Sequence, residues 1–152
     1  MDEYLAIDPG AHKNRRGKAG WCLLDDEGEP QEFGQVNEDE FDKWLMSFLK
    51  EHPNIKLIIC ENYRVAHWNN QKWKANAGSK VETAKQIGSI ETIARLHDVK
   101  VVLQEPSVYP MGAMYGGFEI PTNHSISHQW VAAAHGIYYL QQQGIRKPRI
   151  PE

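Results

Sequence analysis

The sequence contains no long hydrophobic run. None of its apolar stretches approaches the ~20 residues that a membrane-spanning helix requires. The N-terminus also lacks the basic segment followed by an apolar one that marks a secretory signal. We therefore expect a cytoplasmic protein that has no membrane partner.

Cysteine is scarce as well. The chain has two cysteines, Cys22 and Cys60; both lie inside apolar runs, and no Cys-x-x-Cys spacing occurs. This pattern favours buried free thiols over a disulfide or a zinc ribbon.

Excess positive charge is absent, because 17 basic and 20 acidic residues give a net charge of −3. That balance argues against a protein that coats nucleic acid along its whole surface. The average nevertheless hides a segregation of sign. Residues 25–51 hold ten acids and two lysines, whereas residues 62–81 hold no acid at all.

Two basic segments stand out against this background. One covers residues 12–18 and follows the acid Asp8; the other covers residues 62–81 and follows the acid Glu61. Both contain side chains suited to phosphates or unpaired bases. The candidate nucleic-acid-binding residues are Lys13, Arg15, Arg16, Lys18, Arg64, Trp68, Lys72, Trp73, Lys74 and Lys80.

Two short apolar runs each end on a carboxylate. In residues 4–8, Leu5 and Ile7 alternate as in a strand, and Pro9 cannot continue a hydrogen-bonded ladder, so the strand should end at Asp8. Asp-Pro-Gly alone is equally typical of a turn. A second run, residues 56–62, has the same design and ends on Glu61. Two buried carboxylates side by side need a shared proton or a cation, and a divalent metal is the simplest cation.

The remaining pattern predicts a mixed α/β sheet. Residues 19–24 and 31–36 form a hairpin around a turn at 25–30, and Asn37 with Glu40 is a capping box for the helix that follows. That helix crosses over, so residues 56–62 should return parallel to the first strand and bring Asp8 beside Glu61.

The second half of the chain continues this alternation. Residues 62–79 read as a long loop, and a Ser79–Glu82 capping box starts a helix that ends near Asp98. Residues 99–104 are a strand, 106–121 a connection without helical period, and a last helix runs from residues 122–123 to about 142. We expect one domain over residues 1–143 and a basic tail over 144–152.

Three histidines share one stripe of the last helix. His124, His128 and His135 fall within about 40° on a helical wheel. A polar edge with one core histidine explains such a stripe in ordinary terms. A functional stripe and a structural Zn²⁺ site are the alternatives, although the sequence offers no identifiable fourth zinc ligand.

The element order and the two strand-end acids resemble the ribonuclease-H-like superfamily and, within it, the phage branch of RuvC-type Holliday-junction resolvases. The likeness covers nearly the whole chain and is carried by residues 6–10, 59–62, 86–91, 101–108 and 128–140. One position departs from the family. Its last helix usually reads His-x-x-Asp-Ala-x-x-His, whereas here Val131 stands at the aspartate position between His128 and His135.

The resemblance implies a metal-dependent endonuclease that cuts four-way junctions or other branched DNA. It implies catalytic Asp8, Glu61, His128 and His135, with Mg²⁺ or Mn²⁺ on the first three of these, and imidazole tilts the preference towards Mn²⁺. It also implies a homodimer, because resolving a junction takes two symmetric nicks. The expected location is the cytoplasm of a bacterium or of a phage-infected host. The alternative is a catalytically weak protein that binds branched DNA on the same fold.

Overall fold

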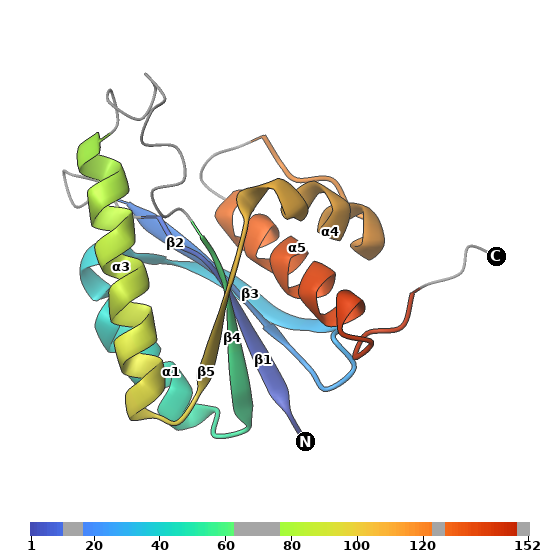
Figure 1. Cartoon of the computed structure of the whole chain (residues 1–152), viewed down its shortest axis with the longest axis horizontal. Helices are drawn as coiled ribbons and strands as arrows, with labels where there is room; N and C mark the ends of the chain where they lie inside the picture. Colours follow the sequence, from blue (N-terminus) through green and yellow to red (C-terminus); the bar gives the residue numbers. More distant parts are fainter. Residues whose placement is uncertain (11–16, 63–76, 123–126, 149–152) are drawn as a thin grey trace.

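A five-stranded mixed sheet forms the centre of the computed structural model, which describes residues 1–10, 17–62, 77–122 and 127–148 (Figure 1). The strand order is β3-β2-β1-β4-β5. The strands are β1 (Glu3–Asp8), β2 (Lys18–Leu24), β3 (Pro30–Asn37), β4 (Ile55–Glu61) and β5 (Lys100–Gln104). The predicted mixed sheet of five strands is confirmed.

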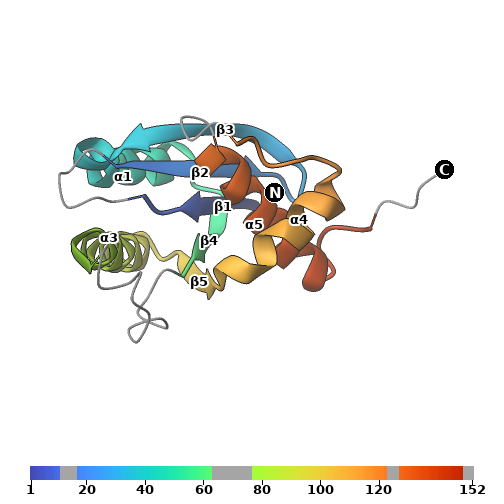
Figure 2. The ribbon, with the colours of Figure 1, turned by 90° about the horizontal axis from the view of Figure 1, so that it is seen from above.

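Helices cover both faces of this sheet. Helices α1 (Phe41–Glu51) and α3 (Ala77–Leu96) lie on one face, and α4 (Tyr109–Gly116) and α5 (Ser127–Gln142) lie on the other (Figure 2). Side chains of β1 alternate between the two layers, since Leu5 and Ile7 pack with α1 and α3 while Ala6 packs with α5. Burial of a side chain the size of Leu5 or Ile7 contributes about 1.5–3 kcal/mol.

The pairing of β1 brings the two acids together. β1 runs antiparallel to β2 and parallel to β4, as the helical crossover predicted. Ile7 pairs with Cys60 in the parallel ladder, so Asp8 and Glu61 follow side by side at the carboxyl edge of the sheet. β5 adds to the outside of β4 in parallel and places Gln104 opposite Glu61.

Helix α5 lies unusually close to the sheet. A Cβ added to Gly20 of β2 would overlap the backbone of His128, and one added to Gly112 of α4 would overlap the backbone of Ala134. Because only glycine leaves room for backbone to meet backbone, these two residues let α5 approach β2 and α4 closely. The close approach fixes where the first turn of α5 sits relative to β1.

Both predicted capping boxes are wrong. Asn37 is the N-cap residue of a 3₁₀ helix, η1 (Glu38–Glu40), that precedes α1, but it makes no side-chain capping bond. Its neighbour Glu38 instead contacts Gly17, whose N–H donates to Glu38 Oε1 at 3.3 Å. Helix α3 already begins at Ala77, so Ser79 lies within the helix and is not its cap. Residues 63–76, most of the predicted long loop, lie outside the described residues.

The connection after β5 contains helix that the sequence pattern did not predict. A 3₁₀ helix, η2 (Pro106–Val108), leads directly into α4. Pro106 and Pro110 occupy first turns, where a missing N–H does no harm, and Gly117 ends α4 with φ 75°. α4 escapes detection because it contacts α5 through small residues, so it shows no apolar period.

The end of α5 folds back on the domain. Gly144 (φ 77°) terminates the helix as predicted, and the N–H groups of Ile145 and Arg146 both donate to Leu140 O. The Arg146 side chain is buried, donates through Nη1 to Gly28 O at 3.0 Å and lies 2.8 Å from Glu29 Oε1. The tail therefore begins as packed structure.

The remaining sequence expectations concern thiols and membrane spans. Cys22 and Cys60 are free and buried, as predicted, and burial raises the pKa of Cys22 to about 12. Within the described ranges, every helix is too short or too polar to cross a membrane.

Candidate active site

Two buried carboxyl groups meet at the carboxyl edge of β1 and β4. Asp8 is 2% exposed and Glu61 is 0% exposed. Burial raises the pKa of Asp8 well above its ordinary range, and the hydrogen bond to Glu61 and the charge of that carboxyl raise it further. The pair therefore favours a shared proton or a bound cation over two uncompensated charges.

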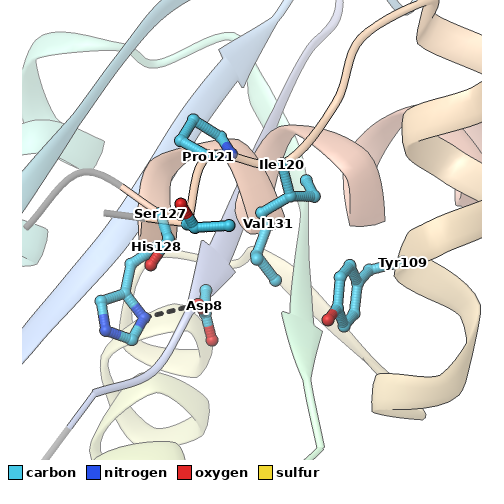
Figure 3. A pocket seen from close by; sticks show the side chains of 8 residues that line it. Asp8, Tyr109, Ile120, Pro121, Ser127, His128 and Val131 are labelled. Carbon is cyan, nitrogen blue, oxygen red and sulfur yellow. Dashed lines mark hydrogen bonds and ion pairs between the residues drawn. The ribbon is translucent and has the colours of Figure 1, made fainter. Parts of the chain in front are cut away.

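His128 approaches this pair from the first turn of α5. Its Nδ1 lies 2.8 Å from Asp8 Oδ2, and its side chain is 35% exposed (Figure 3). The contact depends on Gly20, which pairs with Asp8 across β1 and β2 and also lies against the backbone of His128. A glycine thus sets the distance between the helix and the acid.

His135 lies two turns further along α5 and is completely buried. Its Nε2 is 3.5 Å from Glu61 Oε1, and its Nδ1 is 2.9 Å from Gln104 Nε2. The same Gln104 nitrogen donates to the backbone carbonyl of His135 at 3.1 Å. The two predicted histidines therefore contact different carboxyl groups, in the order His128, Asp8, Glu61, His135.

Sequence reasoning missed Gln104. Its position at the end of β5, beside a strand that ends on an acid, was the available signal, because neighbouring parallel strands end at one edge. An amide has no acid–base chemistry of its own, so a search for ionisable residues passes over it.

A cavity of about 520 Å³ opens beside Asp8. Figure 3 shows His128 and Val131 on α5, with Tyr109 on the other side of the space. Val131 thus faces the cavity and is not enclosed in the core. The complete lining is Asp8, Tyr109, Ile120, Pro121, Thr122, Ser127, His128 and Val131.

The donor set fits a hard divalent cation in part. Two adjacent carboxylates are the ligands that Mg²⁺ and Mn²⁺ favour, and a bound cation would offset the effect of burial and of Glu61, which raise the pKa of Asp8. In the described part of the chain, however, no three side chains among His, Cys, Asp and Glu are arranged to hold a metal ion. Val131 brings no ligand atom to the cavity, and His124 of the zinc alternative lies outside the described residues.

Most of the predicted nucleic-acid-binding residues lie outside the described residues. Lys18 is exposed at the start of β2, and Lys80 belongs to the first turn of α3, where its side chain is not described. The other candidates lie outside the described residues: Lys13, Arg15, Arg16, Arg64, Trp68, Lys72, Trp73 and Lys74. Each basic segment follows a strand, β1 or β4, that ends at the edge of the sheet where Asp8 and Glu61 lie. Gly10 is tethered there by Gln86 of α3, whose Oε1 accepts from its N–H at 3.0 Å.

Comparisons with known proteins place the fold. No family model and no curated protein sequence matches the chain. Among solved structures it is similar to RuvC of Thermus thermophilus in complex with a Holliday junction substrate, at 14% identity and a TM-score of 0.66 over 97% of this chain and 99% of that one. A second Thermus thermophilus RuvC structure matches at 15% identity and a TM-score of 0.62, with the same coverage.

These likenesses cover 97% of the chain. The chain therefore has the ribonuclease-H-like fold of RuvC, as the order of strands and helices predicted. The two structures named above are of RuvC from Thermus thermophilus, so membership of the phage branch stays a prediction.

Proposed function

We propose that this chain is a metal-dependent endonuclease that cuts Holliday junctions or other branched DNA. The observation that carries the proposal is the buried pair of Asp8 and Glu61, with His128 joining it from α5 beside an open cavity. A matched RuvC structure is a complex with a Holliday junction substrate, which supports branched DNA as the substrate class.

The residues of the site divide the work. Asp8, Glu61 and His128 would hold Mg²⁺ or Mn²⁺, which supplies an activated water and stabilises negative charge on the scissile phosphate. When Asp8 is ionised, His128 Nδ1 donates to it, so the lone pair of the imidazole is on Nε2. Through Nε2, His128 would either complete the ligand shell of the metal or take a proton from an attacking water, but not both at once.

Binding rests on the surroundings of the site. The basic segments at 12–18 and 62–81 would contact phosphates, and Trp68 and Trp73 of the second segment would stack on bases exposed at a branch point. A homodimer would supply the two sites that symmetric nicking of a junction requires.

One observation favours a second candidate function, binding of branched DNA without efficient cutting. Val131 lines the cavity where the family that this chain resembles usually has an aspartate. Among the described residues, no three side chains of His, Cys, Asp or Glu are arranged to hold a metal ion. A site with two carboxylates would hold its cation weakly, and the protein would then recognise junctions more effectively than it cuts them.

Incubation with a synthetic four-way junction separates the two functions. The junction and a linear duplex of the same sequence are each tested with Mg²⁺, with Mn²⁺ and with EDTA. Junction cutting that EDTA abolishes, with the duplex left intact, supports the endonuclease. Tight junction binding without cutting in either metal supports the binding protein. Equal binding to both DNAs without cutting contradicts both.

A further inference from the structure

We infer that Gln104 and His135 form a positioning pair that holds the Glu61 carboxylate, and that His135 is neither a metal ligand nor a general base. The inference deepens the proposed function and rests on it for the role of Glu61. It gives His135 a role different from that of His128, with which it shares one stripe of α5.

The contacts of Gln104 fix the direction of the hydrogen bonds. Its Nε2 lies 3.1 Å from the backbone oxygen of His135, which can only accept, so the amide nitrogen must face that atom. The same Nε2 lies 2.9 Å from His135 Nδ1. An NH₂ group carries two hydrogens and no acceptor, so it donates to both atoms.

The tautomer of His135 follows from this geometry. A ring nitrogen that accepts a hydrogen bond carries no proton, so the proton of the neutral imidazole lies on Nε2. That nitrogen lies 3.5 Å from Glu61 Oε1, which is an ion-pair distance and not a hydrogen bond, and among the described residues Nε2 has no hydrogen-bond partner. His135 therefore presents a hydrogen, and not a lone pair, to the carboxylate.

A donor in this position cannot bind a cation or take a proton from water. It can hold one carboxylate oxygen in place, and the side chains of His135 and Glu61 are both fully buried, so neither has room to turn away. Gln104 is fixed in turn, because it pairs with Glu61 in the β4–β5 ladder and its carbonyl accepts from Asn62 N–H at 2.8 Å. Partners of this kind, one step from a metal, typically change metal affinity by about 10–100-fold when removed.

His128 differs in each of these respects. It is partly exposed, lines the cavity and contacts Asp8 through Nδ1. The second ring nitrogen of His128 can therefore bind the metal or accept a proton, whereas His135 positions Glu61.

The tautomer is measurable without metal or DNA. Long-range ¹H–¹⁵N spectra of the imidazoles in the full-length, metal-free protein should show His135 protonated on Nε2 alone. Gln104→Met keeps the side-chain length but removes both donors, and should lose this single-tautomer signature. A wild-type signal with the proton on Nδ1 would overturn the inference.

Mn²⁺ alone, titrated by calorimetry, then tests the role. His135→Gln keeps an N–H near the position of Nε2, so its affinity should stay within about threefold of wild type, whereas His135→Leu should lose about 10–100-fold. His97→Gln, at an exposed position after α3, is the matched control and should change nothing. If His135→Leu does not fold, Gln104→Met takes its place with the same expected direction.

Other outcomes are equally decisive. Equal losses for Gln and Leu would make His135 a metal ligand, and no loss for either would remove it from the site. If wild-type protein neither binds Mn²⁺ nor cuts junctions, the proposed function fails, and the tautomer measurement alone decides whether Gln104 and His135 are paired as described.

Discussion

At the scale of single residues, the site is a balance between two buried acids and the groups around them. Asp8 would be unstable as an isolated ion, because burial and the neighbouring Glu61 carboxyl both raise its pKa. A bound cation would compensate the negative charge of the two carboxylates, and the carboxylates would act as its ligands.

Neutral isosteres at the two acids should separate cutting from binding. We expect Asp8→Asn and Glu61→Gln each to remove nicking while junction affinity stays within a few-fold of wild type. Each change deletes a charge from the cation site but keeps shape and volume. Gel assays of cleavage and of binding on the same junction check this, and near-normal cutting by either variant would exclude that residue as a metal ligand.

Asp8→Asn should also change how stability depends on pH. Because the folded pKa of Asp8 lies above its unfolded value of about 3.9, the wild type loses stability as pH rises above that value and through the folded pKa. In EDTA we therefore expect Asn to raise the melting temperature at neutral pH, with the difference vanishing in acid. A lower melting temperature for Asn at neutral pH would contradict this account.

Val131 tests whether the missing acid limits the chemistry. Since the side chain faces the cavity, Val131→Asp should place a carboxylate near Asp8 and His128 without burying it in the core. Mg²⁺ affinity should rise, as should activity with Mg²⁺ relative to Mn²⁺. Val131→Asn, with similar shape and no charge, is the control, and calorimetry with each metal is the measurement. A large stability loss that metal does not restore would show that the aspartate is not accommodated.

At the scale of elements, the position of α5 determines whether the site exists. The helix brings His128 to Asp8 and His135 to Glu61, and it can do so only because Gly20 leaves its backbone exposed to the helix. Gly20, which has no reactive side chain, thus determines where the side chains of His128 and His135 lie.

Gly20→Ala should therefore damage activity more than its effect on stability explains. The added methyl would overlap the His128 backbone and force the first turn of α5 outward, at a cost of about 1–3 kcal/mol. Gly88→Ala in α3 is the matched control, because a Cβ there meets nothing within 4 Å and should stabilise the helix by about 0.5–1 kcal/mol. Denaturant unfolding and junction cleavage measure the two effects, and normal cleavage by Gly20→Ala would refute the close-approach argument.

Alternation and chain order were enough to predict the strands and the meeting of Asp8 with Glu61. β1 and β4 each end where an apolar run meets an acid, and the crossover rule places them side by side. Helix α4 was beyond such reasoning, because a helix that packs through Gly112 leaves no apolar stripe. The separate contacts of His128 and His135 were also unpredictable, since a helical wheel gives direction around the axis but not which neighbour each turn meets.

At the scale of the whole molecule, charge and site gather at one edge of the sheet. The parallel strands β1 and β4 deliver their acids there, and both basic segments start from the same edge. The opposite edge offers a comparison of equal charge, because Lys50, Lys56 and Lys100 are exposed where α1 ends and where β4 and β5 begin.

Replacing Lys72, Lys74 and Lys80 with alanine should weaken binding to all DNA and flatten its salt dependence. Each lost phosphate contact lowers the log–log slope by about 0.9. Alanine at Lys50, Lys56 and Lys100 removes the same charge from the other edge and should leave the slope nearly unchanged. Titrations of duplex and junction at several salt concentrations check this, and equal effects of both triple variants would place DNA elsewhere on the surface.

The hydrogen bond between Asp8 and His128 joins residues 120 positions apart in the chain. A contact of such long range forms only after the intervening strands have paired and α5 has docked, so chain entropy opposes it until late in folding. A growing or partly unfolded chain therefore holds its acids without their histidine partners. Cutting of DNA, if it depends on both, is then available only from a molecule that has completed its fold.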